Sequence, residues 1–439
     1  MDSPDGPRGT VSHRTPKRLA GESKECDMGG TDFVTKVKRN QGFTNLTAGY
    51  LFPEVARRRK AFEERNPGTR VISLGIGNTT EPLSLRIAEG LRSGALKLGT
   101  REGYSGYGEE QGMGELRALI ARRLYRCRIE PHEVFISDGA KCDIGRLQTM
   151  FGSKLSIAVQ DPAYPVYVDG SVIVGAAGDA IAGNTGYNGI AYLPCVPANS
   201  FFPDLAATPA TNLIYFCSPN NPTGASATRK QLEELVAFAT RNGSIIIYDA
   251  AYAEYISDAS LPKSIFEIEG ARRVALEVNS FSKSIGFTGV RLGWTVVPEE
   301  LRFADGTQVS KDWNRVMTTL FNGASNVAQA GGIAALSDEG LAEMRSSVAH
   351  YMGNAALIKR GLERLGIENY GGSDSPYIWA RFPGKSSWDV FEQILDACAV
   401  VTTPGSGFGP SGEHFLRFSA FGHREDVELA VSRLESKLG

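Results

Sequence analysis

A fifteen-residue segment, SFSKSIGFTGVRLGW (280–294), brings an amine, several hydroxyls and a guanidinium together. Lys283 follows Ser280 and Ser282 closely, and Arg291 comes later in the same segment. Two glycines between Lys283 and Arg291 allow the backbone to turn tightly. A polar surface loop could have the same composition. The segment therefore gains a chemical meaning only from what the rest of the chain supplies.

Three short apolar runs elsewhere in the chain are predicted strands that end in polar residues. They are residues 155–161, 212–218 and 244–250. The last two flank a predicted helix over 228–243, which Gly243 closes at its C-terminal end. Strand, helix and strand with continuously apolar strands are typical of a buried parallel sheet. Ligands of such sheets bind beyond the carboxyl ends of the strands, so the chemistry is expected there.

One candidate ligand-binding turn precedes a predicted helix. In SDGAKCDIGRLQ (137–148), Ala140 and Lys141 come directly after Gly139 at the start of the helix. Free backbone N–H groups and the positive end of the helix dipole make such a turn a suitable phosphate site. An ordinary strand-to-helix turn would have the same pattern.

The other strand ends supply aromatic, amide and acidic side chains. Tyr164 lies between two prolines in QDPAYPVY, where its ring could lie over a flat ligand or pack as part of a turn. In CSPNNPTG two X-Pro bonds and a glycine fix a turn that presents Asn221. Asp249 ends an apolar strand, with Tyr252 on the following turn. A carboxylate at the mouth of a buried strand needs a cationic partner, either an arginine or a protonated ring nitrogen of a ligand.

Composition excludes several classes of protein. The chain has 439 residues, of which 42% are hydrophobic and 22% charged, with a formal net charge of −2. Without a dominant basic patch, a nucleic-acid partner is not expected. The sequence holds no apolar run of about 18 residues, so no membrane span is predicted. Two amphipathic helices are predicted over 54–66 and 114–127.

Metal binding and secretion are not expected either. Six cysteines without a C-x-x-C pair and five scattered histidines suit reduced thiols and no metal site. Residues 1–32 mix Pro, Gly, Ser and charged residues and are predicted to be a disordered tail or a targeting segment. This segment has no hydrophobic core of a secretion signal. Its acidic residues match a plastid transit peptide poorly.

The order of these motifs, SDGAK, DPAYP, SPNNPTG, YDAAY and SFSK…GVRLGW, resembles the fold-type I pyridoxal-phosphate aminotransferases over about residues 40–439. The resemblance implies an α/β fold with a large domain built on a mostly parallel sheet and a smaller α/β domain. The expected divisions are 1–32 (tail), 33–75 (N-terminal arm and part of the small domain), 76–320 (large cofactor domain) and 321–439 (small C-terminal domain).

The same resemblance implies the roles of the site residues. Lys283 would attach pyridoxal 5′-phosphate as a Schiff base and move protons, and Asp249 would hold the pyridinium N–H. Asn221 and Tyr252 would bind the phenolic oxygen, while Tyr164 would stack on the ring. The residues expected to hold the phosphate are Ala140, Lys141, Ser280, Ser282 and Arg291.

A further arginine is implied as the binding group for the substrate carboxylate. Arg417 lies in an otherwise apolar strand, HFLRFSAFG (414–422). An ion pair at the edge of the core is the alternative. The family position instead makes Arg417 a bidentate partner of the α-carboxylate, a geometry that lysine cannot supply.

Additional segments are similar to the plant and chlamydial LL-diaminopimelate aminotransferases: GYLFPE, LGIGNTTEP, EGYSGYGEEQG, FNGASN and TTPGSGFGP. By this resemblance Glu110 reaches from the partner subunit of a homodimer to the distal ammonium of the substrate. Tyr50 and Tyr107 would also cross the interface, Tyr107 toward the cofactor. Gly77 and Asn322 would lie in the substrate site. Ser284-Ile285 departs from the family, which more often has Tyr-Ala beside the lysine.

The family has two plant branches. The segments 199–209, 277–283 and 328–332 look more like the defence-related lysine α-aminotransferases that feed pipecolate formation. DGAKCD and EGYSGYG look more like the diaminopimelate branch of lysine biosynthesis. The prediction is therefore an aminotransferase of L-lysine, with LL-diaminopimelate and 2-oxoglutarate/glutamate as the alternative. Family membership implies a chloroplast location, with the cytoplasm as the alternative.

Other functional classes remain possible on the same scaffold. A catalytically silent binding protein would have no reason to keep Lys283, Asp249, Tyr252, Arg291 and Arg417 together. A lyase or synthase is a nearer rival, because the fold alone does not fix the reaction. If the protein is an enzyme, its expected partners are small amino acids and 2-oxo acids.

Overall fold

The structure is a computed structural model that describes residues 34–46, 51–182 and 186–439. Residues Asn40–Gly439 form one compact unit. Among the described residues, no helix is both long and apolar enough to cross a membrane. The predicted tail, residues 1–32, lies outside the described residues, as does Tyr50.

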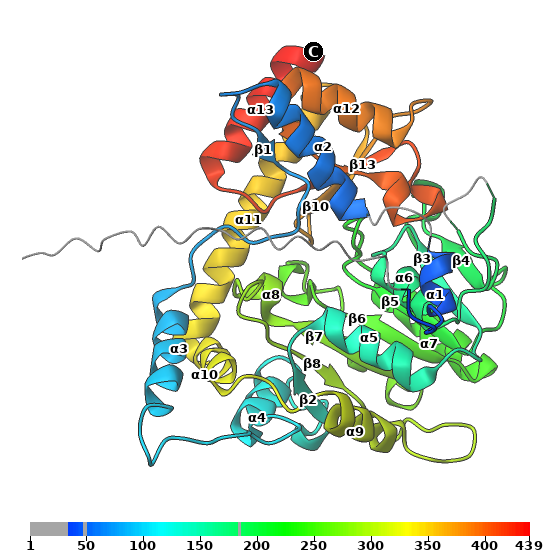
Figure 1. Cartoon of the computed structure of the whole chain (residues 1–439), viewed down its shortest axis with the longest axis vertical. Coiled ribbons are helices and arrows are strands. Elements are labelled where there is room, and N and C mark those ends of the chain that lie inside the picture. Colours follow the sequence, from blue (N-terminus) through cyan, green and yellow to red (C-terminus); the bar gives the residue numbers. More distant parts are fainter. Residues whose placement is uncertain (1–33, 47–50, 183–185) are drawn as a thin grey trace, which may run out of the picture. The chain divides into compact units, whose positions relative to one another are not determined.

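A seven-stranded sheet forms the centre of the unit, with strand order β2-β8-β7-β6-β5-β3-β4 (Figure 1). The neighbours from β4 to β7 pair in parallel, whereas β8 is antiparallel to both β2 and β7. The strands are β2 (Val134–Ser137), β3 (Ile157–Asp161), β4 (Ile190–Pro194), β5 (Leu213–Cys217), β6 (Ile245–Asp249), β7 (Ala275–Ser280) and β8 (Gly293–Val296). The carboxyl ends of the parallel strands therefore meet at one edge of the sheet.

Helices cover both faces of this sheet, because successive side chains of each strand point to opposite faces. In β5, Ile214 and Phe216 belong to one hydrophobic cluster, and Leu213, Tyr215 and Cys217 belong to the other. The first cluster includes α4 (Gly114–Arg123), α7 (Arg229–Asn242) and α10 (Asn326–Ala335). The second includes α5 (Ala140–Phe151), α6 (Val166–Ile173) and α9 (Val309–Leu320). Burial on both faces explains why these strands are continuously apolar.

A second, antiparallel sheet has its own hydrophobic cluster. Its order is β12-β13-β10-β9, with β9 (Asn369–Gly371), β10 (Tyr377–Arg381), β12 (Thr403–Pro404) and β13 (Phe415–Ser419). The helices that contribute to this cluster are α2 (Leu51–Arg65), α11 (Asp338–Arg364), α12 (Ser387–Cys398) and α13 (Arg424–Leu438). The remaining α-helices are α1 (Gln41–Asn45), α3 (Leu85–Lys97) and α8 (Phe281–Ser284).

A segment near the N-terminus, residues 72–74, packs in the hydrophobic cluster of the antiparallel sheet. Strand β1 (Ile72–Ser73) pairs in parallel with β11 (Val400–Val401). The N–H of Ser419 then donates to the carbonyl of Leu74 at 2.6 Å. The segment that continues from Leu74 is thereby fixed between the two sheets.

The elements predicted from the sequence are present, with shifts at their ends. The three strands begin one or two residues later than expected, at Ile157, Leu213 and Ile245. Gly243 ends α7 in the left-handed conformation, with φ 65°. The helix expected over 114–127 ends at Arg123, because Arg126 and Cys127 have positive φ angles that an α-helix does not allow.

Candidate active site

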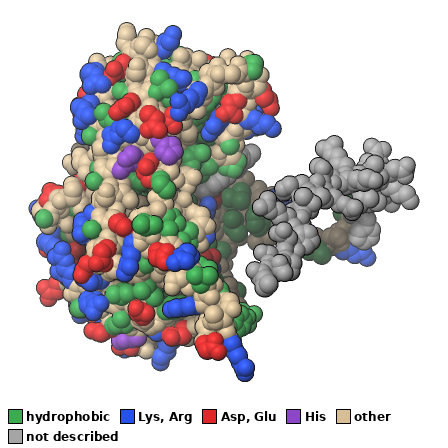
Figure 2. Space-filling model, turned by 90° about the vertical axis from the view of Figure 1, so that its left-hand side faces the viewer, with side chains coloured by type: hydrophobic (Ala, Val, Ile, Leu, Met, Phe, Trp, Pro, Cys, Tyr) green, Lys and Arg blue, Asp and Glu red, His purple; other side chains and the backbone are tan. Residues whose placement is uncertain are grey.

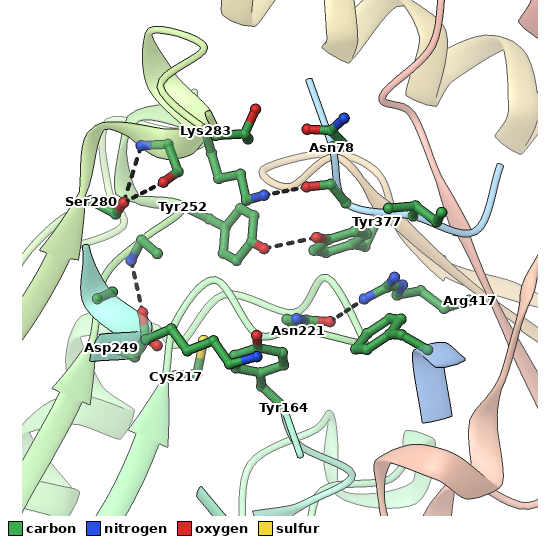
Figure 3. A pocket seen from close by; sticks show the side chains of 18 of the residues that line it. Asn78, Tyr164, Cys217, Asn221, Asp249, Tyr252, Ser280, Lys283, Tyr377 and Arg417 are labelled. Atoms are coloured by element: carbon green, nitrogen blue, oxygen red, sulfur yellow. Dashed lines mark hydrogen bonds between the residues drawn. The ribbon is translucent and has the colours of Figure 1, made fainter. Parts of the chain in front are cut away.

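A cavity of about 480 Å³ opens at the carboxyl ends of the parallel strands (Figure 3). Its lining residues are Phe52, Ile76, Gly77, Asn78, Ala140, Lys141, Tyr164, Tyr167, Cys217, Asn221, Asp249, Ala251, Tyr252, Ser280, Ser282, Lys283, Thr288, Arg291, Tyr377 and Arg417. Residues from both sheets and from the segment after β1 meet here. This is the edge of the sheet at which the sequence predicts the ligand site.

The Lys283 amine lies inside the cavity and donates a hydrogen bond to the Gly77 carbonyl. Strand β7 ends at Ser280, whose side chain caps the short helix α8 that carries the lysine. Burial, together with the positive charges of Arg417 and Arg291, lowers the pKa of Lys283 to about 7. A substantial fraction of the amine is therefore neutral near pH 7, as a nucleophile or a base requires.

A group of hydroxyl and cationic donors lies beside the start of α5. Ser280 Oγ donates to Ser282 Oγ at 2.9 Å, and Arg291 Nη1 donates to Ser282 Oγ at 3.1 Å. Gly139 precedes α5 with φ 125°, and a Cβ there would collide with the Arg291 guanidinium. The helix N-terminus, the hydroxyls and the guanidinium together form a site suited to a phosphate group.

Asp249 is buried at the end of β6 and accepts two hydrogen bonds. Tyr167 donates its hydroxyl to Oδ2 at 2.8 Å, and the Ala251 N–H donates to Oδ1 at 3.0 Å. Burial raises the pKa of Asp249, although both hydrogen bonds oppose this rise. The groups that shift the pKa of this carboxylate are the Ala251 N–H and the Tyr167 hydroxyl, and no arginine among the described residues is one of them. The arginine partner considered from the sequence is therefore not found there.

Arg417 is a buried cation held by neutral groups. Its Nη1 donates to Asn221 Oδ1 at 2.7 Å, and its Nη2 donates to the Gly75 carbonyl at 2.5 Å. The guanidinium lies over the Tyr377 ring, 4.3 Å from the ring centroid. Its buried Nε has no hydrogen-bond partner in the part of the chain that the structure describes. A buried cation among neutral partners is suited to an anionic ligand.

Two tyrosines meet between Lys283 and Arg417. The hydroxyl oxygens of Tyr252 and Tyr377 are 2.7 Å apart. Tyr164 lies on the opposite side of the cavity from Lys283 (Figure 3). Its ring packs edge-on against Tyr167, with the centroids 6.0 Å apart.

Three of the expected site residues lie outside the lining of this cavity. Tyr107 is 85% exposed, and Glu110 and Asn322 are also exposed. They share one region of the surface, because a Cβ at Gly323 would lie 3.1 Å from the Glu109 carbonyl oxygen. Tyr50, expected in the same set, lies outside the described residues.

Several lining residues were not named from the sequence. They are Phe52, Ile76, Asn78, Tyr167, Cys217, Ala251, Thr288 and Tyr377. Phe52, Ile76 and Asn78 belong to motifs that were singled out, but no spacing rule pointed to their side chains. Nothing in the sequence marked Tyr377 as a site residue, because an aromatic residue at the start of an apolar strand is typical of the hydrophobic core.

Comparisons with known proteins agree with this geometry. A sequence model of the family "Aminotransferase class I and II" matches residues 69–434. A rice protein named "Probable LL-diaminopimelate aminotransferase, chloroplastic" is 57% identical over 406 residues, 92% of this chain and 87% of the relative. An LL-diaminopimelate aminotransferase of Protochlamydia amoebophila is 53% identical over 402 residues, 92% and 98% of the two chains.

A solved structure is similar as well. The L,L-diaminopimelate aminotransferase of Chlamydomonas reinhardtii has 58% sequence identity and a TM-score of 0.90, covering 93% of this chain and all of that one. The fold and the site thus define a class I and II aminotransferase of fold-type I. Within that class, the chain belongs to the LL-diaminopimelate aminotransferase family.

Members of this class use pyridoxal phosphate, and the residues present fit that cofactor. The donors beside α5 suit its phosphate, and the Lys283 amine suits its aldehyde carbon. The Asp249 carboxylate, which accepts hydrogen bonds only from the neutral donors Tyr167 and Ala251, suits a ring nitrogen that carries a proton. When bound, the cofactor supplies an electron sink that makes the α-proton of an amino acid acidic. Lys283 and Arg417 line the same cavity, so an amine and a guanidinium lie next to the space where the cofactor would bind.

Proposed function

We propose that this aminotransferase acts on LL-diaminopimelate, exchanging its α-amino group with 2-oxoglutarate. The support for this substrate is the identity of 53–58%, over more than nine-tenths of the chain, to proteins named for it. From the sequence alone, L-lysine is the predicted substrate and diaminopimelate is the alternative. The names of these three relatives favour that alternative, since each of them specifies diaminopimelate.

The site residues have the following proposed roles. Lys283 attaches the cofactor and moves the proton that leaves the α-carbon. Asp249 keeps the ring nitrogen protonated, and Arg417 binds the α-carboxylate. The supporting residues are Tyr164 at the ring face, Asn221 and Tyr252 at the phenolic oxygen, and Ala140, Lys141, Ser280, Ser282 and Arg291 at the phosphate. Gly77 is placed beside the substrate.

The α-carboxylate role of Arg417 has a structural argument. Among the described residues its guanidinium has hydrogen bonds to an amide and a carbonyl oxygen but no carboxylate partner. A substrate carboxylate would supply the missing negative charge and could bind in the planar two-oxygen geometry that guanidinium favours.

Substrate recognition is proposed to need a second subunit. Glu110, Tyr107 and Asn322 are exposed on one region of this chain, away from its own cavity, and Tyr50 joins them by resemblance. In a homodimer they would complete the neighbouring cavity, with Glu110 binding the distal ammonium of the substrate. Exposed apolar side chains nearby in sequence, Leu96 at 59% and Tyr104 at 68%, support a buried contact here. Figure 2 views the molecule from the side of α3 and shows hydrophobic side chains among charged ones on that face.

Two further expectations belong to this proposal. The division at residues 76 and 320 separates a large cofactor domain from a small C-terminal domain to which residues 33–75 contribute. The location proposed is the chloroplast, supported by the name of the rice relative. A fusion of the full chain to a fluorescent protein, viewed in leaf cells, would test the location against the cytoplasmic alternative.

The decisive experiment is a substrate comparison. Purified protein is assayed with LL-diaminopimelate and, separately, with L-lysine, each with 2-oxoglutarate. Formation of glutamate is measured together with that of the new 2-oxo acid. We expect kcat/KM to be far higher with LL-diaminopimelate. A preference for L-lysine would instead support the defence-related function, and no turnover of any donor would support a silent binding protein. Product formation without glutamate would point to a lyase.

A further inference from the structure

Tyr377 is a buried residue that contacts both halves of the site. It begins β10 and is 1% exposed, and its side chain lines the cavity. Tyr377 has no role among those predicted from the sequence or proposed above. Its contacts to Tyr252, Arg417 and Gly77 involve three different parts of the chain.

The first contact is a hydrogen bond between two phenols. The Tyr377 and Tyr252 oxygens are 2.7 Å apart, and their rings meet edge-on with the centroids separated by 5.2 Å. Within the described ranges, neither hydroxyl has another hydrogen-bond partner. One of the two phenols must donate to the other, and the direction decides where the second proton can point.

The second contact indicates that direction. The Arg417 guanidinium lies 4.3 Å from the centroid of the Tyr377 ring. A cation over the ring favours negative charge on the phenol oxygen, so Tyr377 is the stronger acid of the pair and the better donor. Burial raises the pKa of Tyr377, and the Arg417 charge opposes that rise. Tyr252 then accepts from Tyr377 and keeps its own proton for a partner in the cavity.

The third contact involves the segment that holds Lys283. A Cβ at Gly77 would collide with the Tyr377 hydroxyl and would lie 3.8 Å from Lys283 Nζ. The Gly77 carbonyl accepts the hydrogen bond from this amine. The Tyr377 hydroxyl therefore lies close to the lysine as well as to Tyr252 (Figure 3).

We propose that Tyr377 is a positioning residue for transamination: its hydroxyl orients the proton of Tyr252 into the cavity, and its ring supports the Arg417 guanidinium. This inference rests on the proposed roles of Tyr252 and Arg417. The two functions reside in different parts of one side chain. Two substitutions can therefore separate them.

Tyr377→Phe removes the hydroxyl and keeps the ring. A hydrogen bond donated to an ionised phenolic oxygen stabilises that ionised form, so weakening the Tyr252 donor shifts the pH midpoint of the visible absorption of the holoenzyme. We expect Tyr252→Phe to move this midpoint upward and Tyr377→Phe to move it the same way by less. The double variant should move it no further than Tyr252→Phe alone. We expect kcat of Tyr377→Phe to fall about 2- to 10-fold, the range for one neutral hydrogen bond.

Tyr377→Leu also removes the ring under Arg417. Glutarate carries carboxylates but no amino group, so its binding to the holoenzyme by calorimetry reports Arg417 without turnover. We expect Tyr377→Leu to weaken glutarate binding about 3- to 30-fold, the range for a desolvated cation–π contact. Tyr377→Phe should bind glutarate as the wild type does.

Controls separate this inference from a loss of folding and from failure of the proposed function. Tyr248→Phe alters an equally buried tyrosine outside the cavity lining and should leave the midpoint and glutarate binding unchanged. Thermal unfolding identifies variants that fail to fold, and Tyr377→Phe alone still tests the hydroxyl.

If Tyr252→Phe and Arg417→Lys show their effects while both Tyr377 variants resemble wild type, the inference is wrong. If Tyr252→Phe and Arg417→Lys also resemble wild type, the proposed site roles are wrong and the inference falls with them.

Discussion

Tyr167 donates its hydroxyl proton to Oδ2 of Asp249 over 2.8 Å, deep at the end of β6. With the Ala251 N–H on Oδ1, each carboxylate oxygen has one fixed donor. The Tyr167 ring stacks on Tyr215, with the centroids 5.4 Å apart and the planes inclined by 18°. The orientation of the carboxylate is therefore set by the packing of α6 against the sheet.

Asp249→Asn keeps the size of this side chain and removes its charge. We expect the variant to retain part of its cofactor and to lose most of kcat, because an unprotonated ring nitrogen makes a poor electron sink. Tyr167→Phe should cause a smaller loss, about 2- to 10-fold, because the charge remains and only its orientation weakens. Stopped-flow kinetics with bound cofactor measured by absorbance would test both. Wild-type kcat in Asp249→Asn would contradict the proposed role.

Lys283→Ala should abolish the covalent link to the cofactor. Wild-type protein treated with borohydride should carry the cofactor mass on Lys283, as identified by peptide mass spectrometry, whereas the variant should carry none. Turnover should fall by several orders of magnitude, because the substitution removes both the proposed attachment point and the proposed proton-transferring base. A Lys283→Ala protein with near wild-type turnover would exclude the mechanism.

The lowered pKa of Lys283 predicts a pH dependence of stability in the cofactor-free protein. The folded amine has a pKa of about 7, against 10.5 as the ordinary value for an exposed lysine. Between these values the unfolded chain binds more protons, so the free energy of unfolding rises with pH over this window. Urea unfolding at pH 7 and pH 10 should show a gain for wild type relative to Lys283→Met. Equal pH responses of the two proteins would contradict a depressed pKa.

Arg417→Lys keeps the positive charge but loses the planar pair of donors. We expect a rise in KM for both amino and oxo acids and a loss of about 2 kcal/mol in transition-state stabilisation. The effect should appear in kcat/KM for every substrate with an α-carboxylate. Steady-state kinetics with unchanged KM would remove Arg417 from its proposed role.

Glu110→Gln tests the shared active site. The variant should lose turnover of diaminopimelate by about 2–3 kcal/mol more than turnover of a donor without a second amine. In a heterodimer with Lys283→Ala, both substitutions fall in one active site and leave the other intact, if Glu110 acts across the interface. Activity should then partly return on mixing. No return, with heterodimers confirmed by native mass spectrometry, would place Glu110 in its own subunit.

Sequence motifs predicted the parts of the site that lie next to strand ends. Asp249 is the last residue of β6, Asn221 lies in the turn that follows β5, and Lys283 lies in the short helix that follows β7; a parallel sheet brings such positions together. Arg417 enters the cavity from the other sheet, and its position came from the family resemblance and not from the pattern of its strand. Its partners Gly75 and Tyr377 depend on tertiary contacts that no local pattern encodes.

Other features that the sequence did not predict also depend on tertiary contacts. Tyr167 and Tyr215 look like core residues in the sequence, and Tyr215 is one, but the Tyr167 hydroxyl reaches Asp249 across the face of the sheet. The antiparallel insertion of β8 between β2 and β7 also has no local signal, because Gly293–Val296 is short and fully buried, as the parallel strands β3 and β5 are. Tyr107, Glu110 and Asn322 show how a single chain can leave expected site residues at its surface.

The pairing of β1 with β11 has a consequence for synthesis of the chain on the ribosome. Gly75 receives hydrogen bonds from Thr403 and Arg417, and Leu74 receives one from Ser419. The strands of the seven-stranded sheet all lie within residues 134–296, whereas Thr403, Arg417 and Ser419 are synthesised more than 100 residues later. Closing so long a loop is slow and comes late. The cavity is therefore complete only after β13 has been synthesised, and a chain that terminates before β13 would carry Lys283 without Arg417.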